Sequence, residues 1–448
     1  MSTGSVRSSG RGTRSTLRPT CPGRRALAFV MALAPVLSLG TTVLGAHAEE
    51  VLGFEQALHL AQDRSRQLVA QDAAAAAARE MGVAAGQLPD PTLQVGINNL
   101  PINGPDQFSV GRDFMTQRSV GLMQEFTRAD KRKARGARFD REAEVAEAGR
   151  ELALANLQRD TATAWLERYY QERMRDVLAA QRDEAKLQIE AAEAAYNGGR
   201  GARADVFAAR SAVAQIEDRI AQTERQIATA RTQLARWVGD AADQALGEPP
   251  STDAVRLDPA ELETVLAHHP QIAMMVKQEE VARADVDIAR SNEHADWSVE
   301  LTYSQRGSAY SNMVSVNVSI PLQWDHKNRQ DRELMAKLAM ASQMRAQREE
   351  ASREHIAEAR MMLQEWQSDR ERLKGYDDSL VPLAAERTLA AIAAYRGNSA
   401  TLASVLDARR NEIDTRIDRL RLEMETERLW AQLNYLVPAD HGLAPPHQ

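Results

Sequence analysis

The stretch Trp297–Ser304 reads WSVELTYS, and Val314–Trp324 reads VSVNVSIPLQW. Apolar and polar residues alternate strictly in both, which predicts two β-strands, each with one apolar and one polar face. The second stretch has the length of a tilted membrane-spanning strand, and aromatic residues stand at its ends, where a membrane interface would lie. A small sheet packed on helices in water has the same pattern and stays open as an alternative.

A noisier pair of strands precedes this one, around Leu93–Ile97 and Val120–Phe126. We therefore expect two β-hairpins, at 92–126 and 297–324. An open sheet edge cannot be left in lipid, and closed barrels of this kind begin at eight strands, so four strands imply that several copies share one wall. The residues expected to face lipid are Leu93, Val95, Ile97, Val120, Leu122, Phe126, Trp297, Val299, Leu301, Tyr303, Val314, Val316, Val318, Ile320, Leu322 and Trp324.

The chain also repeats itself. AAYNG at 194–198 returns as AAYRG at 393–397, an offset of 199, and residues 58–68 resemble residues 262–272 at an offset of 204. Such self-similarity indicates a tandem structural repeat. The expected organisation is a signal peptide at 1–48, a first repeat at 49–246, a linker at 247–256, a second repeat at 257–438 and a flexible tail at 439–448.

Both repeats have the same expected order of elements, in which a helix, two strands, a very long helix and a final helix follow one another. Apolar residues recur every seven positions from Val206 to Leu234, with a second set three residues later, which predicts a coiled-coil seam. A helix of nearly seventy residues is about 100 Å long, and two shorter helices placed end to end match it. The helices are expected at 54–88, 128–196, 202–238, 260–294, 327–395 and 400–436.

The first 48 residues have the form of a secretory signal peptide. Six arginines precede an apolar run at 26–45, and Ala46-His47-Ala48 is a small-x-small site with cleavage expected after Ala48. A retained membrane anchor is the alternative. The single cysteine, Cys21, precedes the apolar run and is not placed for lipid attachment.

Composition excludes several classes of protein. Aromatic residues make up 5% and charged residues 27%, which is typical of long helices rather than of a thick globular core. Beyond the leader, 50 basic residues face 63 acidic ones, which argues against a nucleic-acid binder. We find no phosphate-binding loop, nucleophile elbow or paired metal-binding histidine motif, and so expect no enzyme, no cofactor and no metal site. His268-His269 and the scattered methionines are interpreted as a polar turn and as packing residues.

The duplicated order and two paired signatures resemble the TolC family of outer-membrane efflux proteins. The signatures are Ala195-Tyr196 with Gly199, Asp205-Val206 and Ala209-Arg210, and Ala394-Tyr395 with Gly397 and Val405 to Ala408. The resemblance covers residues 50–438. It implies a mainly α fold with a small β part: a long helical coiled-coil barrel plus four transmembrane β-strands per chain. It further implies a homotrimeric α/β-barrel with twelve strands and a twelve-helix periplasmic tunnel, located in the outer membrane.

Further segments look like the heavy-metal branch of the family, similar to CzcC and CusC: 98–101, 113–116 and 124–132. This implies an exit duct for cobalt, zinc, cadmium, copper or silver, working with a periplasmic adaptor (membrane fusion protein) and an inner-membrane pump of the resistance–nodulation–division type. A drug efflux duct, a type I secretion duct and a soluble periplasmic coiled-coil scaffold are the alternatives. The sequence departs from the family at Thr127, where proline is expected, and at Ser404, where an acid is common.

The resemblance places the turns between the long helices at the periplasmic mouth. Inter-helix ion pairs there would hold the mouth closed until the adaptor docks, and rings of acids would attract cations. Ordinary solvated charges at helix ends are the alternative. Glycines at these turns are expected to adopt positive φ. The residues expected at the aperture and adaptor contact are Tyr196, Gly198, Gly199, Arg200, Arg203, Asp205, Arg210, Tyr395, Gly397, Asp407, Arg409 and Arg410.

Overall fold

The computed structural model describes residues 51–256, 264 and 268–438. The expected leader with its cleavage site at Ala48, the tail at 439–448, and most of the expected helical turns at 260–267 lie outside the described residues. The described residues all belong to one compact unit, Glu49–Gln448.

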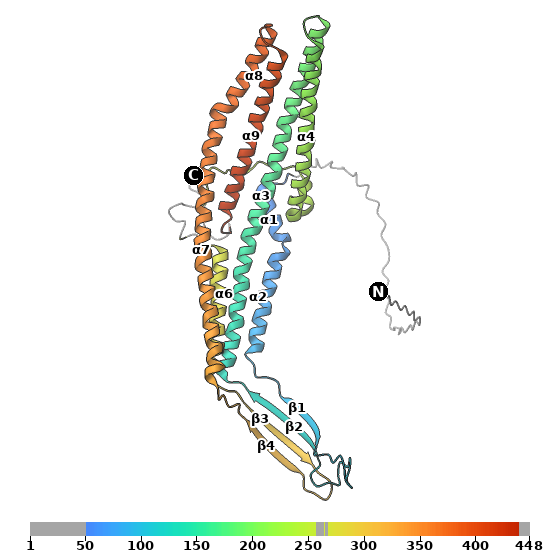
Figure 1. The fold of residues 1–448 in the computed structure, drawn as a ribbon, viewed down its shortest axis with the longest axis vertical. Coiled ribbons are helices and arrows are strands. Elements are labelled where there is room, and N and C mark those ends of the chain that lie inside the picture. Colours follow the sequence, from blue (N-terminus) through green and yellow to red (C-terminus); the bar gives the residue numbers. More distant parts are fainter. Residues whose placement is uncertain (1–50, 257–263, 265–267, 439–448) are drawn as a thin grey trace, which may run out of the picture. The chain divides into compact units, whose positions relative to one another are not determined.

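The described elements are long helices with two short hairpins, as the sequence predicts (Figure 1). The first repeat holds α1 (Phe54–Arg64), α2 (Arg66–Ala85), β1 (Thr92–Asn98), β2 (Gln117–Phe126), α3 (Ala129–Asn197), α4 (Arg203–Val238) and the 3-10 turn η1 (Gly239–Asp243). The second holds α6 (Pro270–Ser291), β3 (Trp297–Gln305), β4 (Met313–Ser319), η2 (His326–Asn328), α7 (Gln330–Gly375), the π-helical turn η3 (Tyr376–Leu380), α8 (Val381–Arg396) and α9 (Leu402–Asn434). The mainly α fold with a small β part is confirmed.

The first helix of each repeat differs from the expectation of one continuous element. In the first repeat the helix is interrupted at Ser65, whose hydroxyl accepts a hydrogen bond from the Leu68 N–H at 3.3 Å. His269 stands at the equivalent position, 204 residues later, and its Nδ1 accepts from the Gln271 N–H at 3.2 Å. Both side chains cap a new helix start, so a local polar group competes with continuation of the helix.

The long helices pack as the sequence predicts. α3 contacts α1 and α2 along one part and α4 along another, while α6 packs on α3 and α7. The predicted seam of α4 is buried at Val206, Val213, Ile220 and Leu234. In the second repeat, η3 joins α7 to α8 with helical backbone angles at both joints, so the chain continues as one rod beside α9.

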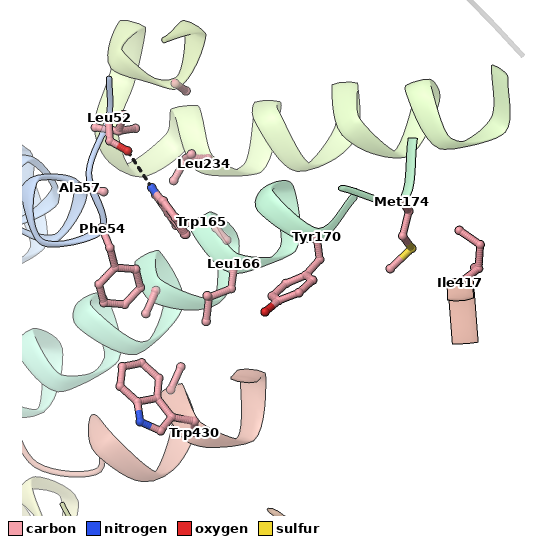
Figure 2. Close-up of a cluster of buried hydrophobic side chains, with 14 of the residues drawn as sticks. Leu52, Phe54, Ala57, Trp165, Leu166, Tyr170, Met174, Leu234, Ile417 and Trp430 are labelled. Atoms are coloured by element: carbon pink, nitrogen blue, oxygen red, sulfur yellow. Dashed lines mark hydrogen bonds between the residues drawn. The ribbon is translucent and has the colours of Figure 1, made fainter. Parts of the chain in front are cut away.

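The largest buried cluster lies where α1, α3, α4 and α9 meet (Figure 2). Trp165 on α3 is fully buried, stands edge-on to Phe54 with ring centroids 5.5 Å apart, and donates its indole N–H to the Leu52 carbonyl at 3.2 Å. Trp430 on α9 donates to the Ala254 carbonyl at 2.9 Å. The expected linker at 247–256 is thus held against this core by its backbone.

The two hairpins form one antiparallel sheet in the order β1-β2-β3-β4, so β2 and β3 join the repeats. The register aligns apolar residues across all four strands, as in the row Leu93, Leu122, Leu301, Val316. One expectation is wrong: β4 ends at Ser319, not at Trp324. Pro321 has no N–H for the ladder. Ile320, Leu322 and Trp324 therefore lie beyond the strand, although all three side chains are exposed.

Candidate functional site

The apolar face of the sheet is exposed. The apolar residues in the rows that cross all four strands are largely exposed, from 47% for Tyr303 to 73% for Val95. The other face is polar, and Ser119 and Ser304 on it are buried. A continuous apolar face that no described helix covers marks a surface built for contact with something other than water. The exposed members of this apolar face are Leu93, Val95, Ile97, Val120, Leu122, Trp297, Leu301, Tyr303, Val314, Val316 and Val318; Phe126 and Val299 are half-buried.

Both edges of the sheet are open. Within the described ranges β1 pairs only with β2, and β4 pairs only with β3. Neither strand contains proline. Unpaired edges of this kind are templates for pairing with another chain. The sheet is therefore apolar on one face and incomplete at both sides.

Aromatic rings gather where the strands meet the helices. Phe126, the last residue of β2, stacks on Trp297, the first residue of β3, with centroids 4.5 Å apart and planes 15° from parallel. Trp324, which follows β4, is 87% exposed. Aromatic rings at this level are typical of a membrane interface.

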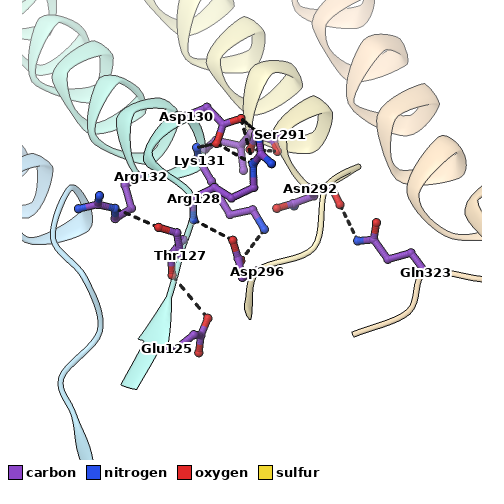
Figure 3. A network of polar contacts seen from close by, with 11 residues as sticks. Glu125, Thr127, Arg128, Asp130, Lys131, Arg132, Ser291, Asn292, Asp296 and Gln323 are labelled. Carbon is purple, nitrogen blue, oxygen red and sulfur yellow. Dashed lines mark hydrogen bonds and ion pairs between the residues drawn. The ribbon is translucent and has the colours of Figure 1, made fainter. Parts of the chain in front are cut away.

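A polar network ties the two repeats together at the same level (Figure 3). The Lys131 ammonium donates to Asp296 Oδ2 at 2.7 Å, and the Arg128 backbone N–H donates to Asp296 Oδ1 at 2.9 Å. Burial alone would raise the pKa of Asp296, but these two contacts bring that pKa below its ordinary value. Lys131 lies in the first turn of α3 and Asp296 directly precedes β3, so this buried pair links the points at which the two hairpins meet the helices.

The two turns between long helices have the same backbone. In each turn a backbone N–H donates to the carbonyl oxygen five residues earlier. Arg200 donates to Ala195 in the first turn and Ser399 donates to Ala394 in the second, both at 2.9 Å. The residue with positive φ is Gly199 in the first turn, at 72°, and Asn398 in the second, at 60°. The expectation of positive φ is thus confirmed for Gly199 and wrong for Gly198 and Gly397, which have φ of −80° and −78° as helix caps. Asparagine tolerates this geometry because its short polar side chain bonds locally.

The turns meet through a small apolar cluster that holds Val206 from one repeat and Val405 from the other. Tyr395 packs against this cluster, whereas Tyr196 is exposed. The structure therefore brings the predicted residues of both repeats to one end of the helices (Figure 1).

The charged residues of the turns make unequal contacts. Arg210 pairs with Glu193 at 2.7 Å inside the first helical hairpin. Its equivalent in the second repeat, Arg409, is buried and crosses to Glu184 and Gln181 on α3. Arg410 also crosses, donating to Gln215 on α4 at 2.8 Å. The arginines of the second turn thus reach the first repeat, while Arg210 of the first turn pairs within its own hairpin.

The predicted acids do not occupy equivalent places. Asp205 accepts a hydrogen bond from the Ala202 N–H at 3.2 Å and so caps the start of α4. Thr401 caps α9 instead, by accepting from the Ser404 N–H. Asp407 is exposed and lines a groove between α4 and α9. Arg200 is exposed, and Arg203 lies over the Phe207 ring at 5.6 Å.

Two titratable groups are buried where the sequence gives no sign of it: His269, expected in a polar turn, and Glu427 on α9. Burial, together with His355 stacked 4.7 Å away, lowers the pKa of His269 to about 4. Burial raises the pKa of Glu427 on α9 to about 7, against the effect of the hydrogen bond from Tyr170. Their partners, like the pair Lys131–Asp296, come from other elements, so spacing along the chain gives no signal for them.

Metal-binding clusters and membrane-spanning helices are both absent from the part of the chain that the structure describes. No group of His, Cys, Asp or Glu in the described ranges is arranged to hold a metal ion. None of the described helices combines the length and apolar character needed to cross a membrane.

The fold has relatives among solved structures, although no family model and no curated protein matches the chain. A membrane protein from Pseudomonas aeruginosa is 17% identical, with a TM-score of 0.72, over 86% of this chain and 93% of that one. The outer membrane protein VceC of Vibrio cholerae is 19% identical, with a TM-score of 0.70, over 86% and 95%. CusC is 17% identical, with a TM-score of 0.68, over 86% and 92%. The chain has the fold of these membrane proteins.

Proposed function

We propose that the protein is an outer-membrane exit duct of a tripartite efflux system, and not an enzyme. The observation that carries this proposal is the four-stranded sheet, with its exposed apolar face and two unpaired edges. In water such a sheet is a liability, but in lipid the apolar face is satisfied. The edges must then be closed by other copies of the chain, since lipid offers no hydrogen bonds.

Three copies are the proposed assembly. Four strands from each would make a twelve-stranded barrel, and the long helices would continue it as a tunnel on the periplasmic side. The likeness to solved outer-membrane channels and the leader-like first 48 residues support this location. A periplasmic adaptor and an inner-membrane pump of the resistance–nodulation–division type are the proposed partners.

Membrane fractionation followed by native mass spectrometry tests this function. We expect the protein to stay in outer-membrane fractions through high-salt washing, to need detergent for release, and to have the mass of a trimer. Reconstituted into planar bilayers, it should conduct ions. A freely soluble monomer obtained without detergent would contradict the duct and would favour the periplasmic scaffold.

Heavy-metal cations are the proposed cargo, on the resemblance of 98–101, 113–116 and 124–132 to the CzcC- and CusC-like branch. In the structure Thr116 donates to the Asn99 carbonyl at 2.9 Å, and Asp113 accepts from the Met115 N–H at 2.7 Å. These residues shape the loop between β1 and β2. The cargo is tested by growing a deletion strain, with and without the gene restored, on zinc, cobalt, cadmium, copper and silver salts. Restored resistance to organic compounds alone would contradict a metal cargo.

The crossing contacts of the second turn are the proposed latch of the periplasmic mouth. Arg409 and Arg410 tie α9 to α3 and α4, so their release would let α8 and α9 move away from the first repeat. The groove between α4 and α9 is lined by Ala208, Ala212 and Ala403, whose small side chains admit a helix of the adaptor.

Single-channel conductance tests the latch. Asp407→Ala combined with Arg409→Ala should raise the conductance several-fold, because the buried tie to Glu184 is lost. Arg210→Ala is the matched control, since it removes an equivalent arginine whose pair stays within one hairpin, and it should leave the conductance unchanged. Equal effects of the two variants would remove the assignment.

A further inference from the structure

A buried carboxyl group, that of Glu427, links the two repeats between α3 and α9. Glu427 on α9 is 6% exposed, and its Oε1 accepts a hydrogen bond from the Tyr170 hydroxyl of α3 at 2.5 Å. The Thr252 hydroxyl lies 3.5 Å from the same oxygen. The other oxygen, Oε2, is buried and has no hydrogen-bond partner among the described residues.

This asymmetry distinguishes the two protonation states. An ionised carboxylate accepts hydrogen bonds at both oxygens, and a buried oxygen without a donor leaves the charge uncompensated. A protonated acid places its hydroxyl on one oxygen and accepts at the other. The arrangement around Glu427, with a donor for one oxygen only, fits the protonated acid.

Among the described residues, the arginines around Glu427 are engaged with other carboxylates. On α9 itself, Arg419 is engaged by Glu423 at 2.7 Å and by Asp377 of η3 at 2.5 Å. On the linker at 247–256, Asp253 pairs with Arg370 of α7 at 3.4 Å. Tyr169 and Tyr170 face it from α3, and Arg428, next along α9, lies 3.9 Å from Glu167 of α3.

A pocket adjoins Glu427 between α7, η3, α9 and the linker at 247–256. Its wall includes Glu427, Glu371 and Lys374 along with the ion pairs just described. Glu371 and Lys374 are exposed at its rim. Water in this pocket, or the Lys374 ammonium on its wall, can therefore approach the carboxyl group once that group is charged. The π-helical turn η3, whose Asp377 engages Arg419, forms the same wall.

We propose that Glu427 is a proton-binding site that controls the contact between α3 and α9. The described arrangement is that of the protonated acid. On deprotonation the proton leaves through the pocket to bulk water, and the carboxylate left behind draws water or the Lys374 ammonium towards Oε2. The packing of α9 on α3 is then loosened, so proton concentration sets how firmly the two repeats are joined. The proposal needs only the fold and is independent of the proposed function.

Infrared titration of the full-length protein in detergent tests the protonation directly. We expect the carbonyl band of a protonated carboxylic acid at mildly acidic pD, lost on passing to mildly alkaline pD. The band should be absent in Glu427→Gln and retained in Glu423→Gln, the matched control one turn away. In Tyr170→Phe its frequency should shift, because the hydrogen bond to the carbonyl is gone. Absence of any Glu427-dependent band at acidic pD overturns the proposal.

Amide hydrogen exchange tests whether the packing of α9 on α3 loosens when Glu427 loses its proton. After correction for the intrinsic pH dependence of exchange, amide protection in 422–430 should fall by about tenfold or more between the two pH values in the wild type. Glu427→Gln keeps an acceptor for Tyr170, carries no charge, and should be equally protected at both. An equal pH-dependent change in wild type and Glu427→Gln overturns the link between proton and packing, whether or not the protein is a duct.

Discussion

Two tryptophans show how the burial of apolar side chains differs between the long helices and the sheet. Trp165, in the helical unit, is fully buried and its indole N–H is satisfied, whereas Trp324, beside the sheet, is 87% exposed. The long helices bury their apolar side chains against one another within one chain.

The apolar face of the sheet is not covered by the described helices, and its two edge strands are unpaired on one side within the described ranges. The difference indicates that the sheet is suited to another solvent and to further copies of the chain.

The largest expected effect separates the two tryptophans. Trp165→Ala should lower the free energy of unfolding by about 3–5 kcal/mol, because it leaves a cavity among fully buried side chains and removes the indole hydrogen bond to the Leu52 carbonyl. Trp324→Ala should change helical stability by less than about 0.5 kcal/mol. Thermal unfolding followed by circular dichroism measures both. Similar losses in the two variants would mean that Trp324 is part of a folded core.

The next effect compares the two faces of β4. Val316→Arg places a charge on the exposed apolar face and should cost membrane insertion about 2–4 kcal/mol. Asn317→Arg, one residue later on the opposite face, is the matched control and should alter ion selectivity while leaving insertion intact. Folding yield into lipid vesicles reports the difference. If both variants insert equally well, the apolar face does not meet lipid.

A third test concerns the junction between the two regions. Asp296→Ala leaves the buried Lys131 ammonium without its partner and should destabilise the protein by about 3 kcal/mol. Lys131→Met in the same chain should recover part of this loss, because the unpaired charge is removed. Urea unfolding of the single and double variants measures the coupling. Additive losses would show that the two residues do not act as a pair.

The helical unit should also respond to pH where the sheet does not. The pKa of Glu427 is raised from 4.5 to about 7, so between these values the folded state holds a proton that the unfolded state releases. Its stabilising effect is complete at low pH and lost as pH rises towards 7. The loss is about 3 kcal/mol, since one pKa unit corresponds to about 1.4 kcal/mol. Melting temperature against pH should flatten in Glu427→Gln; an unchanged slope would contradict the assignment.

The features that could be predicted from sequence are those that one segment carries by itself. The heptads from Val206 to Leu234 predict the buried seam of α4, and the alternation in 297–304 predicts β3. The cap at Ser65 and the missing N–H of Pro321 are local features too. A single residue is a weaker signal than a hydrophobic pattern repeated over many residues, so the ends of the elements at these two positions are not predicted.

Features that need two distant segments could not be predicted. Arg210 and Arg409 are equivalent in sequence, yet one is exposed and the other buried, because only the second turn crosses to the other repeat. The same holds for Glu427, whose environment is set by α3 and α7 as much as by α9. Tertiary packing decides these contacts, and no spacing along the chain encodes them.

A spin-label scan of β4 in lipid bilayers tests the central claim most directly. Labels placed one at a time at 313–319, in a Cys21→Ser background, report collisions with oxygen, which concentrates in lipid, and with a water-soluble nickel chelate. We expect oxygen contact at Val314, Val316 and Val318 and nickel contact at Ser315 and Asn317, alternating with every residue. Uniform access of the nickel reagent along the whole strand would contradict a sheet that faces lipid.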